Sequence, residues 1–402
     1  MWRELPRPVR ALVGVRVLNQ LGAYVMPFLA VIAGPGLATE ALAVFGVAAL
    51  ASRWLGGVLL DRLPPRTLIV GGLAATGAAL LLLAAAHGPV LVLGAVALAG
   101  LAFELYEPAT QESLARLTGE ERRGDVYGLL GTSLVAAGAV AGLIAAVLLP
   151  LGARWLAAVD AGTCLVAAGV AYVYLEREPV RRGVVQSARW RPSGTLVRLT
   201  LAGTAFACGY LAVLMFMPFV LLQRGAPEWL PGVALTCAAV LAPLTGRLGR
   251  RRLDGFAHGR VLAVGTAVLG VLAFAMATGR AVPLLVAAYV AWAVVDSVLQ
   301  GRWQAVVAED APERERPRWF AFFGSSWGVA QPAVPVLVAA TGRLMATAGA
   351  AFLLVPAILA APTGRRGPRG PSRDPSRGRM RHLRKMTTST RSARTEHTTS
   401  MQ

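Results

Sequence analysis

Charged residues are scarce in this chain of 402 residues, in which Asp, Glu, Lys and Arg together make up only 15%. Soluble domains carry about 25% charged residues, so the composition argues against an ordinary soluble protein. The few polar residues gather in short clusters between long apolar runs.

Metal-binding and catalytic motifs are also absent from the sequence. Cys164, Cys208 and Cys237 lie inside apolar runs at unrelated spacings, as small buried side chains do, and match no metal site. No G-x-x-x-x-G-K-[ST] and no H-E-x-x-H occurs. The stretch GSSWG at 324–328 lies in an apolar run without a nearby histidine, so it is not a nucleophile elbow. We expect no metal, no cofactor and no enzymatic activity.

Long apolar runs are abundant, because 55% of the residues are hydrophobic. A helix needs about 20 apolar residues to cross a hydrocarbon core, and inside lipid a helix is the only open-chain structure that satisfies its own backbone. The sequence therefore predicts an all-α integral membrane protein with twelve transmembrane helices. The predicted spans are 11–33, 41–60, 67–87, 89–111, 126–149, 154–175, 196–222, 229–246, 260–279, 282–305, 318–341 and 343–361.

Arginine is distributed unevenly between the links that join these spans. Alternate links, such as 34–40 and 150–153, hold almost none, whereas 61–66 and 176–198 are rich in it. The positive-inside rule then places both termini in the cytoplasm. The net charge of +19 comes from these inner links and from the tail 362–402, which we expect to be disordered. We expect a monomer in the cell (inner, cytoplasmic) membrane, with lipid around it and no nucleic-acid partner.

Two halves of the chain repeat one pattern. Met26-Pro27-Phe28 returns as Met217-Pro218-Phe219, and GEERRGDVYGLLGTS at 119–133 returns as PERERPRWFAFFGSS at 312–326. These near-constant offsets predict two six-helix bundles, 1–175 and 196–361, joined by a cytoplasmic linker at 176–195. Two such halves around a site near the middle of the membrane are typical of secondary transporters.

The stretch GGVLLDRLPPR resembles the loop 2–3 signature of the major facilitator superfamily, with Gly57, Asp61, Arg62 and Arg66 at the matching positions. The helix 4–5 and 10–11 regions resemble those of its drug:proton antiporter branch. Two features of that branch are missing: an arginine inside helix 4 and a Gly-Pro pair in helix 5.

The resemblance implies that the loop signature forms a gate. Asp61 would accept hydrogen bonds from the start of a helix of the other half near Arg318, and Arg62 or Arg66 would pair with Glu112. Alternatively, these charges only mark the inner face.

Acidic residues inside the spans are candidates for proton coupling. Glu104 and Glu107 are three residues apart and would share one helix face, and Asp296 lies in the tenth span. Arg16 could pair with Glu104 or Asp296. Alternatively, Glu107 faces the inner water beside Arg116 and only Glu104 is buried, or Glu104 forms a static bridge with Arg16 or Arg53. We expect a further acid, Asp160, to reach toward Arg154 at the outer surface.

Polar and aromatic side chains within the spans are candidates for a central cavity that accepts varied apolar cations. Ordinary helix packing is the alternative for each. The candidates are Asn19, Gln20, Tyr24, Tyr210, Trp292 and Trp327.

These patterns predict a secondary transporter that exports small amphipathic molecules, driven by protons. Export follows from the resemblance alone. The alternatives are an uptake or amino-acid transporter of the same fold, and a polytopic membrane scaffold or enzyme.

Overall fold

The computed structural model describes residues 5–118, 123–176, 190–253, 255–312 and 315–361, which are almost entirely helical. Parts of the repeated segments, most of the linker predicted at 176–195 and the whole tail lie outside these residues. The helices of the first half are α1 (Arg7–Leu21), α2 (Val25–Ala33), α3 (Ala38–Leu60), α4 (Pro65–Ala85), α5 (Pro89–Phe103), α6 (Glu107–Leu117), α7 (Arg123–Leu148) and α8 (Arg154–Tyr174). Those of the second half are α9 (Gly194–Gln223), α10 (Leu230–Leu253), α11 (His258–Thr278), α12 (Val282–Leu299), α13 (Arg302–Asp310), α14 (Arg316–Thr341) and α15 (Leu344–Ala360).

Most of the predicted spans correspond to long apolar helices. In the described part of the chain, 10 helices or pairs of continuing helices are long and apolar enough to cross a membrane. The twelfth predicted span is α15, a shorter apolar helix of 17 residues. The first predicted span is divided into α1 and α2.

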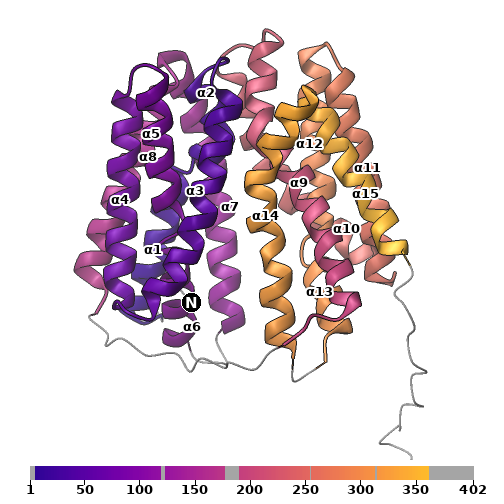
Figure 1. Cartoon of the computed structure of the whole chain (residues 1–402), viewed down its shortest axis with the longest axis horizontal. Coiled ribbons are helices and arrows are strands. Elements are labelled where there is room, and N and C mark those ends of the chain that lie inside the picture. The colour runs from indigo at the N-terminus through magenta and orange to yellow at the C-terminus, as the bar shows by residue number, and fades with distance from the viewer. Residues whose placement is uncertain (1–4, 119–122, 177–189, 254, 313–314, 362–402) are drawn as a thin grey trace, which may run out of the picture. The chain divides into compact units, whose positions relative to one another are not determined.

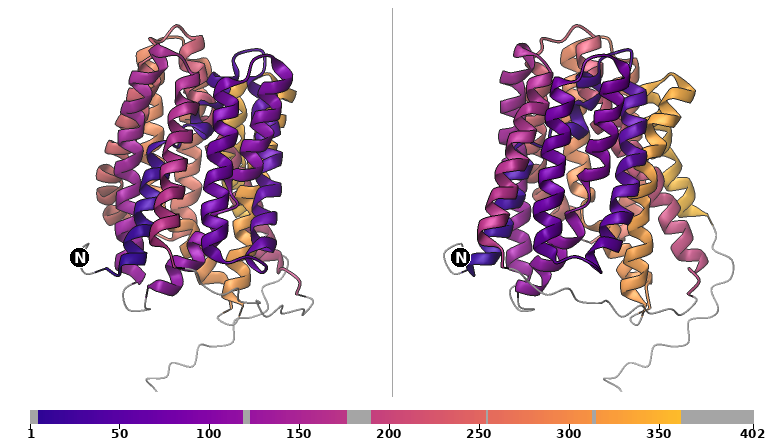
Figure 2. Two further views of the ribbon diagram at one scale, coloured as in Figure 1. Left: turned by 90° about the vertical axis from the view of Figure 1, so that its left-hand side faces the viewer. Right: turned by 60° about the vertical axis from the view of Figure 1, so that its left-hand side comes forward.

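The helices form two groups that lie side by side (Figure 1). Helices α1–α8 make up one group and α9–α15 the other, and successive long helices run in opposite directions (Figures 1 and 2). The start of α1, the link between α3 and α4, and the end of α15 all lie at the lower end in Figure 1. The arginine-rich link between α3 and α4 therefore lies at the same end as the first and last described helix ends, as the positive-inside argument requires.

Three of the predicted spans are interrupted, at residues 22–24, 104–106 and 300–301. Proline explains the first two interruptions. A proline ring clashes with the carbonyl four residues earlier and donates no hydrogen bond to it; for Pro27 and Pro108 those carbonyls belong to Ala23 and Glu104. At the third, Gly301 adopts a left-handed conformation with φ 81°, which ends α12 without strain.

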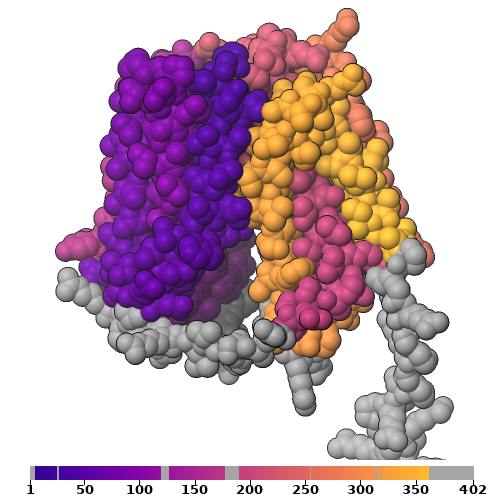
Figure 3. Space-filling model, viewed as in Figure 1, coloured from indigo at the N-terminus to yellow at the C-terminus, as the bar shows by residue number. Residues whose placement is uncertain are grey.

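The two groups touch most closely near the upper end, away from the arginine-rich links. On α7 and α10, a Cβ added to Gly142 would lie 2.8 Å from the carbonyl oxygen of Gly232. Nearby, the Thr236 hydroxyl donates to the Ala139 carbonyl at 3.0 Å. On α3 and α14, a Cβ on Gly46 would lie 2.7 Å from Cα of Pro332. The space-filling view shows a narrow opening between the groups farther down (Figure 3). The molecule is therefore closed above and open below.

We predict that Gly142→Val disfavours this closed upper end. The added side chain meets backbone atoms of α10, which cannot move aside alone, and such overpacking costs about 1–3 kcal/mol. Spin labels at the exposed positions Leu151 and Trp229, one in each group, should therefore show longer distances in the variant. Gly128→Val is the control, because no atom lies within 4 Å of a Cβ there. Identical distance distributions in both variants would contradict the prediction.

Candidate functional site in the central cavity

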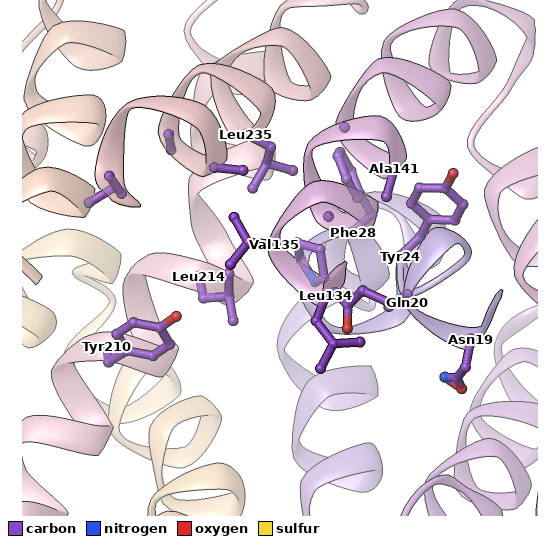
Figure 4. Close-up of a pocket in the computed structure, with 18 of the residues that line it drawn as sticks. Asn19, Gln20, Tyr24, Phe28, Leu134, Val135, Ala141, Tyr210, Leu214 and Leu235 are labelled. Carbon is purple, nitrogen blue, oxygen red and sulfur yellow. The ribbon is translucent and has the colours of Figure 1, made fainter. Parts of the chain in front are cut away.

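A cavity of about 590 Å³ lies between the two groups of helices. Its volume falls within the range of about 300–1,000 Å³ typical of small-molecule sites. Its walls are mainly apolar and come from both halves of the chain, with Leu134, Val135, Leu214 and Leu235 among the lining residues (Figure 4).

The structure brings most of the cavity candidates together. Asn19, Gln20 and Tyr24, around the break between α1 and α2, line one side, and Tyr210 of α9 lines the other (Figure 4). Trp292 of α12 lines the same cavity. Trp327 of α14 lines an adjoining space of about 380 Å³, which shares Tyr210 with the main cavity.

The wall from the second half is an aromatic cluster beside a carboxylate. The ring of Tyr210 lies 5.3 Å from that of Trp292 and 5.3 Å from that of Trp327. Tyr289 stacks on Trp292 at 5.9 Å. Asp296 follows Trp292 by one turn of α12, is only 8% exposed and lines both spaces. Aromatic faces beside an acid can hold a positively charged group.

The wall from the first half contains an acid that the sequence analysis misplaced. Asp160 of α8 is 4% exposed and lines the cavity. The expectation that it reaches toward Arg154 is wrong, since the Arg154 guanidinium contacts His87 at 2.7 Å. Close packing holds Asp160 inward: a Cβ on Gly22 would lie 2.8 Å from its Cα. That approach depends on the break in the first span and could not be read from spacing.

The two acids of the fourth span are held by arginines. Arg53 of α3 donates two hydrogen bonds to Glu104, from Nε at 3.1 Å and from a terminal nitrogen at 2.9 Å. Arg16 of α1 forms an ion pair with Glu107. Because α5 ends at Phe103 and α6 begins at Glu107, the two acids do not continue one helix face. Neither acid is among the residues that line the main cavity.

These pairs assign different positions to the four coupling candidates. Glu107 and Arg16 are bound to each other, and Glu104 is bound to Arg53, which was the static alternative for Glu104. Among the residues that the structure describes, Asp296 forms no ion pair; the Gln300 side chain supplies a hydrogen bond to it. Asp296 is therefore the candidate that faces the cavity with its charge unmatched.

A family model of the Major Facilitator Superfamily matches residues 13–335, which is most of the chain. The chain belongs to this superfamily. It is thus assigned to a family of multi-pass membrane transporters, and not to a family of enzymes.

Individual relatives are distant. A "Na(+), Li(+), K(+)/H(+) antiporter" of Planococcus maritimus is 34% identical over 146 residues, 34% of either chain. "Multidrug resistance protein MdtH" of Yersinia pestis (strain Pestoides F) is 27% identical over 254 residues, 60% of either chain. The chain thus matches about a third and three fifths of these relatives' lengths. The crystal structure of an auto-inhibited POT family peptide transporter superposes with a TM-score of 0.71 at 13% identity, covering 90% of this chain and 99% of that one. This likeness shows the fold alone.

The loop signature of this superfamily transporter lies at the open lower end. Gly57 is exposed near the end of α3, and Asp61 and Arg62 are exposed in the turn that follows. Arg66 donates to the carbonyl of Tyr172 in α8, and its guanidinium lies 4.8 Å from the centre of the Tyr172 ring. Glu112 is exposed on α6. In the described part of the chain, neither Arg62 nor Arg66 pairs with Glu112.

We predict that the Arg53–Glu104 pair stabilises the transporter. Glu104→Gln should lower the free energy of unfolding by more than the double variant Arg53→Gln/Glu104→Gln does, because the single change leaves a half-buried guanidinium without its acid. A double-mutant cycle on thermal unfolding in detergent should give a coupling energy of about 1 kcal/mol. Strictly additive effects would show that the two side chains do not act as a pair.

Proposed function

We propose that this protein exports small amphipathic molecules across the cell membrane in exchange for protons, as a monomer that alternates between inward-open and outward-open forms. One observation carries the proposal: Asp296, buried beside Tyr210, Tyr289 and Trp292, lines the cavity between the two halves. An acid in this place can bind either a proton or the positive charge of a substrate, so that one displaces the other.

Asp296 suits this exchange better than Glu104 or Glu107. A coupling acid must bind and release its proton within reach of the substrate, and ionisable groups at depth are functional by default. Glu104 and Glu107 are each held by a guanidinium outside the cavity lining. We therefore propose that those acids pair with the arginines and hold the helices together, and that they do not compete with the substrate for protons.

The cavity favours an organic substrate over a bare metal ion. Its lining is mainly apolar and aromatic, and such walls bury carbon surface rather than supply oxygen ligands. In this respect the site accords better with the relative named as a multidrug resistance protein than with the one named as a monovalent cation antiporter. Export, rather than uptake, is proposed from the sequence resemblance to drug:proton antiporters.

We expect that Asp296→Asn abolishes the response of efflux to a pH gradient, while gradient-independent exchange persists with a lower affinity for the cationic substrate. The amide has about the same size as the carboxyl group, but it carries no negative charge and does not bind and release a proton. Proteoliposomes loaded with a fluorescent amphipathic cation, with an imposed pH gradient, provide the measurement. Glu104→Gln and Glu107→Gln should retain gradient-driven efflux in those molecules that fold.

Glu40→Gln is the matched control, because Glu40 is an exposed acid at the upper end of α3. Its efflux should equal that of the wild type. If efflux by Asp296→Asn still responds fully to the gradient while efflux by Glu104→Gln or Glu107→Gln does not, the acids of the fourth span couple protons to transport. If the wild type moves the dye equally with and without a gradient, proton antiport is wrong.

We further propose that Asp61 closes the lower end in the outward-open form, by accepting hydrogen bonds from the start of α14 at Arg316. Its exposure in the turn fits a gate that is released when the lower end is open. An acid at a helix N-terminus contributes about 0.3–1 kcal/mol, enough to bias two states without trapping one.

The gate predicts that Asp61→Asn favours the inward-open form by up to about fivefold, the ratio that ~1 kcal/mol corresponds to. Spin labels at the exposed positions Thr67 and Ala321 can report the two populations by their distances. Glu112→Gln distinguishes the acids of the motif: an equal shift would show that general loss of negative charge, rather than the contact of Asp61, moves the equilibrium.

A further inference from the structure

The cavity contains two buried carboxylates that belong to different halves of the molecule. Asp160 comes from α8 and Asp296 from α12, and they are 4% and 8% exposed. Both line the same space. The one basic side chain among the described lining residues, Arg250, donates to the backbone carbonyl of Ser297. The lining therefore carries an excess of negative charge, which favours cations.

Each carboxylate is accompanied by a buried polar group that lacks a protein partner. The Tyr24 hydroxyl, in a residue 1% exposed, and Nε1 of Trp292, in a residue 3% exposed, make no hydrogen bond in the described structure. Both residues line the cavity. A buried polar group without a partner costs free energy unless a ligand or water satisfies it. Both ends of the cavity are thus incomplete in the protein alone.

The two ends are built independently. Tyr24 lies in the break after α1, and Gly22 in the same break packs against the backbone of Asp160. Trp292 and Asp296 are four residues apart on α12 and so share one face. In the described part of the chain, these contacts at the two ends involve different helices from different halves.

Resting on the proposed function, we propose that the cavity selects molecules with two positively charged groups, one bound at Asp160 and the other at Asp296. The apolar side chains between the halves, among them Leu134, Val135, Leu214 and Leu235, would contact the carbon chain that joins the charges. Tyr24 and Trp292 would supply aromatic faces at the two ends. Such a substrate bridges the two halves, and a monocation would engage only one of them.

The test compares dications with monocations of the same length. Bis(trimethylammonium)alkanes with four to ten carbons serve as dications, and the same chains with a hydroxyl in place of one ammonium serve as monocations. Binding to the full-length protein in lipid nanodiscs is measured by calorimetry. We expect the wild type to bind at least one dication about tenfold or more tightly than its monocation. The second buried charge pair should contribute more binding free energy than a tenfold change in affinity requires.

Asp160→Asn should lower the affinity for that dication by about 30-fold or more and leave the monocation nearly unchanged. Asp160→Glu should retain the preference, and Glu40→Gln should behave as the wild type. Should Asp160→Asn not fold, the wild-type comparison and Asp160→Glu still decide the matter. Equal affinities for dication and monocation in the wild type, or equal losses of both in Asp160→Asn, would overturn the proposal.

The same samples separate this inference from the proposed function. A wild type that expels a fluorescent monocation under a pH gradient but shows no dication preference keeps the proposed function and refutes the role of Asp160. A wild type that prefers dications but expels nothing under a gradient keeps the two-charge site and refutes proton-driven export.

Discussion

The arrangement of this transporter depends on how each charge placed among apolar helices is compensated. Isolated charges are expensive in such surroundings, so they pair, reach water or take part in function. Arg53 with Glu104 and Arg16 with Glu107 are pairs of the first kind and tie α3 and α1 to the interrupted fourth span. Asp61 and Arg62 belong to the second kind, since they lie exposed in a turn. Asp160 and Asp296 line the cavity between the halves, where the side chains of Cys164 and Gln300 donate to them.

The interruptions of the helices place these charges. Pro27 and Pro108 each remove a helical hydrogen bond, and the resulting breaks lie beside Asp160 and at Glu104. The break at Glu104 also frees its backbone N–H, which donates to the hydroxyl of Ser52 at 3.1 Å. Irregular backbone is tolerated at membrane depth only where protein or a cavity surrounds it. The same prolines therefore interrupt the helices and determine where polar groups can lie among the apolar helices.

Much of the fold could be predicted from apolar length alone, because span length is set by the thickness of the bilayer. The predicted span 154–175, for example, is realised as Arg154–Tyr174. Family membership also followed from local sequence, in the turn after Gly57. The helix breaks were missed even though the sequence shows Pro27 and Pro108, since proline often only bends a helix. The partners of Glu104 and the inward position of Asp160 depend on contacts between helices far apart in sequence, which no local pattern encodes.

The remaining question is how binding of a ligand in the cavity can change the contacts at the lower end. Gly46 of α3 packs against Pro332 of α14, and Arg53 lies two turns farther along α3. The Arg53 side chain approaches α14 as well, at 3.6 Å from a Cβ built on Gly328, while it holds Glu104. An inward tilt of α14 would therefore press on a side chain already bound to the interrupted span. Because packed helices move as stiff units, closure around a ligand bridging the halves would be transmitted along α3 to the turn that contains Asp61.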